Sequence, residues 1–154
     1  MANAKRPLFY TGGGIVNSGP VASARLRELV RMTGFPITST LMGLGAYPAS
    51  DQHWLGMLGM HGTYEANNAM HDCDVMICIG ARFDDRITGR VDAFSPGSKK
   101  IHVDIDRSSI NKNVHVDIPI VGDCGRVLEQ MMAVWQAKKP KVDKTALKSW
   151  WVEI

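Results

Sequence analysis

The chain has 154 residues, which is enough for one domain whose apolar core needs neither disulfides nor a metal. Its net charge of +3 resides in the last 17 residues, where five lysines outnumber Asp143 and Glu153 by three, so residues 1–137 carry no net charge and do not indicate nucleic-acid binding. The three cysteines, an odd number without zinc-ligand spacing, and the lack of a signal peptide or a bilayer-long apolar stretch indicate a cytoplasmic protein that does not bind membranes.

The first half of the chain predicts two strands and one helix, followed by a long loop. In chain order these are strand 6–11 with a glycine turn at 12–14, helix 18–34, strand 35–40 and loop 41–62. The helix is marked by Ser18 as its N-cap, Pro20 in its first turn and Gly34 just past its end. The loop contains five glycines and one proline, and a loop of this length in a compact domain is typically functional or disordered.

The second half alternates between helices and strands. In chain order they are helix 63–73, strand 74–81, connection 82–98, strand 99–106, a helical turn at 107–113, strand 116–123 and helix 124–139. Thr63 is the expected N-cap of the first helix, and Pro119 favours an edge position for the last strand. The whole pattern predicts an α/β fold: a doubly wound, mainly parallel Rossmann-like sheet of about five or six strands, with helices on both faces and the ligand site at the carboxyl ends of the strands.

Glycines and acidic residues stand at the expected strand ends. Gly12 to Gly14 either form a plain turn or let the backbone approach a phosphate. The run lacks G-x-G-x-x-G spacing, and the absence of GxxxxGK[ST] from the chain excludes a P-loop nucleotide triphosphatase. Asp104 is placed to accept hydrogen bonds from a ribose, although it follows the glycines by about 90 residues instead of the usual ~20. Asp106 has the alternative role of N-cap to the next turn.

A second polar cluster follows the strand at 74–81. Arg82 and Arg86 bracket Asp84 and Asp85, and the four side chains either form surface ion pairs or present guanidinium groups to a phosphate or carboxylate. His61, before the helix at 63–73, either contacts a ligand or caps a turn. The remaining histidines lack ligand spacing and are expected to be structural: His53, His71, His102 and His115. The residues alone therefore predict a site for an elongated, phosphate-containing ligand that they do not identify.

Residues 55–89, LGMLGMHGTYEANNAMHDCDVMICIGARFDDRITG, together with the later HVDID and VGD, resemble the central domain of the large, catalytic subunit of acetolactate synthase (acetohydroxyacid synthase). The motifs occur in the order and spacing of that family, and the resemblance covers residues 5–137. It implies that residues 1–137 form a central domain with an FAD site. It further implies that residues 138–154 are an interdomain linker to an absent third domain, with Trp150 and Trp151 lacking the neighbours they would pack against.

The resemblance also implies an activity for the full-length protein. Such an enzyme decarboxylates pyruvate on thiamine diphosphate and joins the product to a second 2-keto acid, pyruvate or 2-oxobutanoate, in branched-chain amino-acid biosynthesis. Other domains hold the thiamine diphosphate and Mg²⁺, so the isolated domain is expected to be inactive. The expected partners are those domains, further copies of the subunit and a small regulatory subunit. Two alternatives remain: a central domain of the glyoxylate carboligase or pyruvate oxidase type, and a free-standing nucleotide-binding module.

The same resemblance assigns roles to individual residues. The positions that match the FAD site of the family are Gly13, Gly14, Thr40, Leu41, Met42, Leu58, Gly59, Met60, His61, Gly80, Ala81, Arg82, Asp84, Arg86, Ile87, Asp104, Ile105, Asp123 and Cys124. Arg86 also matches an arginine that recognises the carboxylate of the second keto acid, and Met60 matches a methionine near the active-site channel. Met60 and Asp85 fall where sulfonylurea-type inhibitors contact relatives. No catalytic residue and no metal ligand is expected within this domain.

Overall fold

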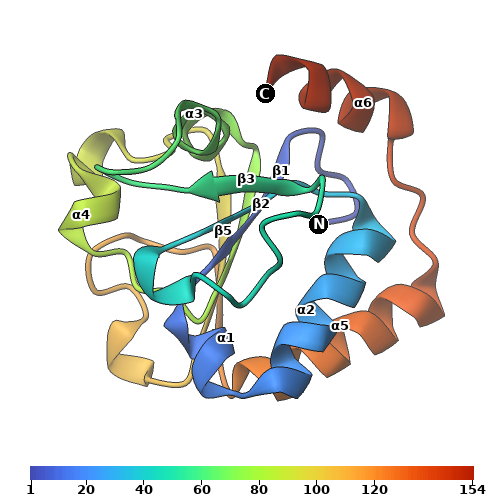
Figure 1. The fold of residues 1–154 in the computed structure, drawn as a ribbon, viewed down its shortest axis with the longest axis horizontal. Helices are drawn as coiled ribbons and strands as arrows, with labels where there is room; N and C mark the ends of the chain where they lie inside the picture. Colours follow the sequence, from blue (N-terminus) through green and yellow to red (C-terminus); the bar gives the residue numbers. More distant parts are fainter.

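A computed structural model, which describes residues 1–154, shows a single parallel sheet between two layers of helices (Figure 1). The six strands are β1 (Pro7–Thr11), β2 (Ile37–Ser39), β3 (Trp54–Met57), β4 (Val75–Ile79), β5 (Lys99–Asp104) and β6 (Ile118–Val121). The α-helices are α1 (Gly13–Asn17), α2 (Pro20–Thr33), α3 (Tyr64–Asp72), α4 (Asp85–Thr88), α5 (Cys124–Lys138) and α6 (Lys144–Glu153). Short 3₁₀ turns are η1 (Leu41–Gly43), η2 (Val91–Ala93) and η3 (Arg107–Ser109).

The strands lie in the order β3-β2-β1-β4-β5-β6, and every neighbouring pair is parallel. The chain therefore builds outward from β1 in one direction and then from β4 in the other. This is the strand order of doubly wound dinucleotide-binding domains, whose ligand crevice opens where the order reverses. The predicted fold class is confirmed, and Pro119 does lie in an edge strand.

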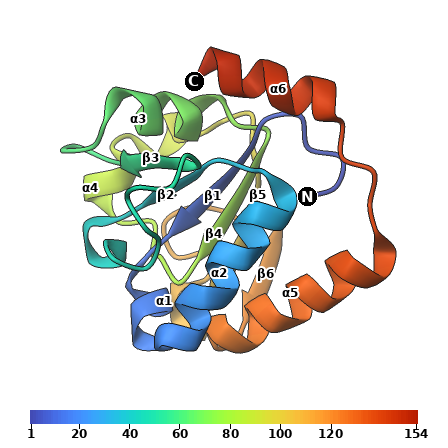
Figure 2. The same ribbon diagram turned by 45° about the vertical axis from the view of Figure 1, so that its right-hand side comes forward.

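Alternating strand residues supply two separate apolar cores, one on each face of the sheet. Phe9 packs with α2 and α5 on one face, for example with Leu26 and Leu128. Leu8 and Tyr10 point to the other face, where α3 contributes Ala66 and Ala69. Figure 2 shows α2 and α5 together on one side of the sheet and α3 and α4 on the other. Such a two-faced core is what the uninterrupted apolar run of β4 requires.

Three of the predicted helix signals, Thr63, Pro20 and Gly34, are confirmed, and one is wrong. Thr63 caps α3, since its side chain accepts a hydrogen bond from the amide of Ala66, and Gly34 ends α2 in a left-handed conformation (φ 72°). Ser18, however, is not an N-cap. It ends the short helix α1, and Gly19 (φ 87°) then turns the chain into α2, which begins at Pro20. Glycine adopts a positive φ easily, so Gly19 interrupts the helix that the sequence predicts to begin at Ser18.

The structure corrects two expected loops. Within residues 41–62, Trp54–Met57 form β3, an edge strand in which Ile37 pairs with Trp54 and Ser39 with Met57. This strand is short and contains Gly56 with a positive φ (96°), so the strand propensities of its residues do not predict it. The glycine turn at 12–14 is the start of α1. Asp106 takes the capping role, because its carboxylate accepts the amide of Ser108 at the start of η3.

The expectation that the two tryptophans near the C-terminus lack neighbours is wrong. Helix α6 lies across the amino ends of the strands. Trp150 is only 2% exposed and packs in the same apolar core as the buried residues of α3. The indole N–H of Trp150 donates to the carbonyl of Pro7, and that of Trp151 donates to the carbonyl of Gly34, both at 3.0 Å. Figure 2 shows α6 and α1 at opposite ends of the sheet. No helix is both long and apolar enough to cross a membrane.

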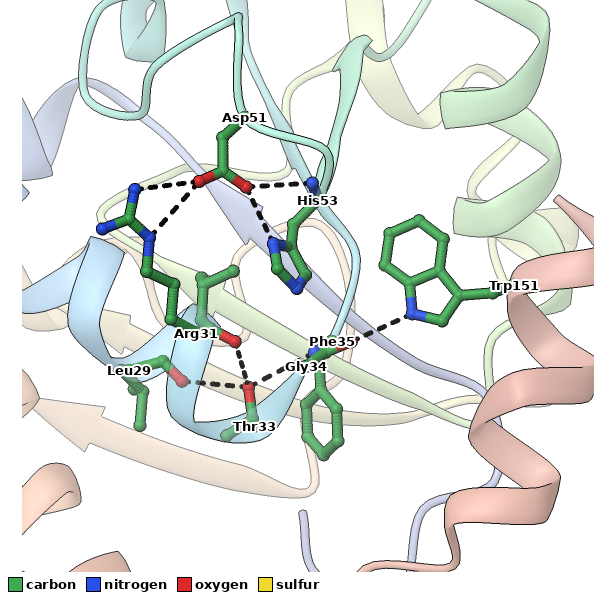
Figure 3. A network of polar contacts seen from close by, with 9 residues as sticks. Leu29, Arg31, Thr33, Gly34, Phe35, Asp51, His53 and Trp151 are labelled. Atoms are coloured by element: carbon green, nitrogen blue, oxygen red, sulfur yellow. Dashed lines mark hydrogen bonds and ion pairs between the residues drawn. The ribbon is translucent and has the colours of Figure 1, made fainter.

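A polar network ties α6 to α2 and to the segment before β3 (Figure 3). The Asp51 carboxylate accepts the backbone amide of His53 at 3.0 Å, lies 2.7 Å from Nδ1 of the same residue, and pairs with Arg31 at 3.1 Å. The His53 ring meets the Trp151 indole edge-on, with 5.8 Å between ring centroids. The His53 amide, with smaller contributions from the His53 and Arg31 side chains, holds the pKa of Asp51 well below its usual range.

We expect Asp51→Asn to lower the free energy of unfolding by about 1–2 kcal/mol near neutral pH, because the donors around it lose a charged acceptor. Asp51 has a depressed pKa in the folded state, so its contribution is complete above the unfolded pKa of about 3.9 and is lost only as the pH falls from there toward the folded pKa. Urea unfolding at about pH 7 and about pH 3 should therefore show a difference between the two proteins that is smaller at the lower pH but has not vanished. Asp72→Asn, at an exposed residue without a hydrogen bond, is the control. A difference that is the same at both pH values would contradict this role.

Candidate functional site

A cavity of about 650 Å³ opens at the carboxyl edge of the sheet, within the size range of small-molecule sites. It is lined by the segments that follow β1, β2, β4, β5 and β6. The lining residues are Gly13, Gly14, Asn17, Ser18, Thr40, Leu41, Met42, Gly80, Ala81, Arg82, Asp84, Asp85, Arg86, Ile87, Asp104, Ile105, Asp123 and Cys124. The sheet thus brings together residues more than 100 positions apart in the chain.

All but four of the residues predicted for the FAD site line this cavity; the four are Leu58, Gly59, Met60 and His61. These four lie next to it. The amide of Met60 donates to the carbonyl of Arg86 at 3.0 Å, and a Cβ on Gly59 would come within 2.6 Å of Ile87. Leu58 is buried, whereas Met60 and His61 are exposed. His61 makes no hydrogen bond, so it does not cap the turn.

The cavity floor depends on glycines at the point where the strand order reverses. The amide of Gly14 donates to the carbonyl of Gly80 at 2.9 Å, joining the ends of β1 and β4. A Cβ on Gly14 would come within 2.6 Å of the Gly80 Cα, and one on Gly12 within 2.4 Å of the Gly80 carbonyl oxygen. Gly80 itself has φ 63°. Gly12 and Gly14 are therefore needed for close contact between two backbones, which is more specific than the plain turn considered from the sequence.

Two arginines stand along one wall of the cavity, in the segment after β4. Arg82 pairs with Asp84 at 3.0 Å, but Arg86 lies 3.8 Å from Asp85 and its side chain is 75% exposed. Exposed pairs of this kind contribute about 0–1 kcal/mol to stability. The Arg86 guanidinium has no other partner, so its donors are available to an anion. The ion-pair interpretation of this cluster holds for Arg82 and only weakly for Arg86.

Two further aspartates line the cavity after the neighbouring strands β5 and β6. Asp104 is buried, and its carboxylate accepts the amide of Asp106 at 2.8 Å while a second oxygen lies 3.9 Å from His102. Asp123 caps α5 and accepts the Ser18 hydroxyl at 2.7 Å. The Ser18 hydroxyl and the Arg126 amide hold the pKa of Asp123 below its usual range, which keeps it ionised at neutral pH. Both carboxylates keep acceptor capacity for hydroxyl groups of a ligand.

Sequence reasoning missed Asn17 and Ser18 as lining residues. Ser18 reaches the cavity because α1 is a single turn, and its partner Asp123 is 105 positions away. No local pattern signals such a pair. Cys124 also lines the cavity, and burial raises the pKa of its thiol to about 11. It is therefore protonated at neutral pH and is not a nucleophilic thiolate.

Of the histidines expected to be structural, two have clear structural contacts. His102 is fully buried and its Nε2 lies 2.8 Å from the carbonyl of Ala81, and His53 belongs to the network around Asp51. His71 and His115 are exposed. The arrangement as a whole offers two arginines beside two aspartates after β4, two further carboxylates after β5 and β6, and a glycine floor. These groups suit the binding of an elongated ligand with anionic groups and hydroxyls.

Comparison with known proteins agrees with this architecture. Residues 1–131 match the family described as thiamine pyrophosphate enzyme, central domain. The chain is 48% identical to the acetolactate synthase large subunit of Haemophilus influenzae over 98% of its length, and 45% identical to the acetolactate synthase isozyme 3 large subunit of Escherichia coli K12 over 98%. It is 47% identical to the acetolactate synthase of Mycobacterium leprae over 87%.

These relatives are much longer than the chain, which spans only 26%, 26% and 21% of them. The similarity therefore concerns one domain of each relative. The family match covers most of the described fold, from the residues before β1 to the middle of α5. The chain belongs to the family of thiamine pyrophosphate enzyme central domains.

Proposed function

We propose that this chain is the flavin-binding central domain of an acetolactate synthase large subunit. The observation that carries the proposal is the cavity at the carboxyl edge, which collects nearly all residues that the family resemblance assigns to FAD. Support also comes from relatives named acetolactate synthase that align with almost the entire chain at 45–48% identity. The neighbouring Leu58–His61 segment would form the outer part of the same site.

The residues present fit FAD in their chemistry. The guanidinium groups of Arg82 and Arg86 match a diphosphate, and the carboxylates of Asp104 and Asp123 match ribose or ribityl hydroxyls. The cavity volume of about 650 Å³ is that of a site for a large organic ligand. In acetolactate synthases, which the chain resembles, the flavin takes no net redox part in the reaction. The chain's own contribution is to bind and orient the cofactor.

For the full-length protein we propose the acetolactate synthase reaction. It condenses pyruvate with a second 2-keto acid on thiamine diphosphate, with release of CO₂. In that protein Arg86 would bind the carboxylate of the second keto acid, which agrees with its free guanidinium, and Met60 would face the substrate channel. Thiamine diphosphate and Mg²⁺ would be bound by other domains. A regulatory subunit and further copies of the large subunit are the proposed partners.

The proposed domain limits follow the same family. Residues 1–137 would form the central domain, and residues 138–154, which include α6, would connect it to a following domain. A cytoplasmic location is proposed because all three cysteines are free and buried, as is usual in a reducing compartment. A central domain of the glyoxylate carboligase or pyruvate oxidase type is the second candidate, since these relatives share the domain.

We expect the wild-type chain to bind FAD with a dissociation constant above about 1 µM, because neighbouring domains and subunits complete the site in the full enzyme. Arg82→Ala and Arg86→Ala should each weaken binding about 10-fold through loss of a charge-assisted hydrogen bond. Arg90→Ala is the matched control, since Arg90 is exposed, pairs with Asp92 and lies outside the cavity lining. Flavin fluorescence titration gives all four affinities.

Three outcomes would contradict the proposal. Equal effects of the Arg86 and Arg90 variants would place the flavin elsewhere. Submicromolar affinity of the wild-type chain would show that other domains are not needed to complete the site. Formation of acetolactate from pyruvate by the chain alone, with thiamine diphosphate and Mg²⁺ added, would contradict the assignment of catalysis to other domains.

A further inference from the structure

The backbone after β4 is held by hydrogen bonds from three side chains that are distant in sequence. Nε2 of His102 lies 2.8 Å from the carbonyl oxygen of residue 81, and the Tyr10 hydroxyl donates to that of residue 82 at 3.0 Å. The amide group of Asn113 donates to the carbonyl of residue 83 at 2.8 Å. Three successive carbonyls are thus bound by β5, by β1 and by the segment before β6. A carbonyl oxygen only accepts, so Nε2 of His102 carries the proton.

Aromatic packing fixes the same segment from the inside. The Phe83 ring lies 4.9 Å from the His102 ring, 5.7 Å from the Tyr10 ring and 5.6 Å from the Phe94 ring, measured between centroids. Both His102 and Tyr10 are completely buried. Burial lowers the pKa of His102, so it is neutral and keeps a single N–H for this bond near pH 7. These contacts leave the main chain of residues 81–83 little freedom.

The other end of the segment is also fixed. The carbonyl of Arg86 accepts the amide of Met60, and the amides of Ile87 and Thr88 bond to the carbonyl of Asp84 to form α4. Yet the side chains that the segment presents to the cavity are largely exposed, at 66% for Arg82 and 75% for Arg86. The hydrogen bonds therefore hold the backbone in place while the Arg86 guanidinium stays free and that of Arg82 pairs only with the exposed Asp84. Fixing a binding group before the ligand arrives reduces the entropy lost on binding.

We propose that His102, Tyr10 and Asn113 are positioning residues for the arginine loop, residues 82–86, which they hold in its ligand-binding conformation. Their effect on ligand affinity rests on the proposed flavin site. Their effect on the conformation of the loop does not rest on it, because that conformation belongs to the ligand-free chain. None of the three lines the cavity, so each acts through the backbone that it bonds.

A matched pair of substitutions tests His102. His102→Leu removes the N–H donor and keeps an apolar side chain, whereas His102→Gln keeps an N–H near the position of Nε2. Amide hydrogen exchange in the ligand-free protein reports the loop through the amides of Met60, Ile87 and Thr88. We expect these amides to exchange about 10-fold faster in His102→Leu, while α2 amides change less, and His102→Gln to restore most of their protection.

Asn113→Ala keeps the test valid if His102→Leu does not fold, because Asn113 is exposed and its loss leaves the core intact. It should also accelerate exchange of the loop amides. FAD affinity measured in parallel should fall about 10-fold in His102→Leu and change less than about 3-fold in His102→Gln. Tyr10→Phe, which removes only the hydroxyl, should weaken FAD binding in the same direction.

Two results would overturn the proposal. If His102→Leu and His102→Gln exchange alike, or if the loop amides accelerate no more than those of α2, His102 is a core residue without a positioning role. A wild-type chain that binds no flavin would contradict the proposed function instead. The exchange measurement would still decide the positioning role, because it needs no ligand.

Discussion

Gly12→Ala is expected to lower the free energy of unfolding by about 1–3 kcal/mol, which is the usual cost of overpacking a protein interior. It should also abolish FAD binding, because the two backbones that form the cavity floor would have to separate. The new Cβ would lie 2.4 Å from the Gly80 carbonyl oxygen and 2.6 Å from the Ala81 Cα. These are backbone atoms, which cannot move without separating the ends of β1 and β4. Gly80→Ala should be at least as damaging, since it adds a positive φ of 63° to a 2.7 Å contact with Gly14.

Two other glycines provide controls. Gly97 has open space around it and no positive φ, so Gly97→Ala should change stability by less than about 0.5 kcal/mol. Gly45 has φ 89° with open space, so Gly45→Ala measures backbone strain without a clash. Urea unfolding and flavin titration are the two measurements. Wild-type stability and affinity in Gly12→Ala would show that the strand ends at the switch point can separate without loss.

Trp150→Ala should cost about 3–5 kcal/mol, the largest effect expected of any single truncation in α6. The indole is 2% exposed, packs in the core below α3 and donates to the carbonyl of Pro7 at the start of β1. Removing it leaves a cavity and a carbonyl without its donor, so α6 should detach from the sheet. Trp150→Phe should cost less, because it keeps part of the packing and loses the hydrogen bond.

Val152→Ala is the control within the same helix, since Val152 is 80% exposed. Urea unfolding followed by circular dichroism gives the three stabilities, and protease sensitivity of residues 144–153 reports whether α6 is docked. If Trp150→Ala behaves like Val152→Ala, α6 contributes nothing to the stability of the domain. The predicted result would place α6 within the folded unit, although it follows the segment matched by the family.

The sequence predicts the sheet well where each element has its own local signal. The apolar run of β4 and the Thr63 cap are such signals, and the carboxyl-edge site follows from the parallel topology. The elements that the sequence does not predict, β3 and α6, lack such local signals. Strand β3 has four residues and a glycine with positive φ, and α6 owes its place to long-range bonds with Pro7 and Gly34.

The site shows the same division. The glycines and charged residues of the site can be recognised in the sequence because they follow predicted strands. Their hydrogen-bond partners cannot be recognised there. The Ser18–Asp123 bond joins α1 to α5 across 105 positions, and the anchors of the arginine loop come from three separate elements. Composition and spacing do not identify the ligand. The proposal that it is FAD rests on the family resemblance, and the cavity has groups of suitable chemistry.

The most direct test of the flavin-binding proposal is an NMR titration of the isotope-labelled wild-type chain with FAD. If the cavity binds flavin, chemical-shift changes will be concentrated at the carboxyl edge, at Gly13, Thr40, Arg82, Asp104 and Asp123, and α6 will be unaffected. Shifts that gather at α6 and His53, or that spread evenly over the surface, would contradict it. A complete lack of shifts at millimolar FAD would do the same.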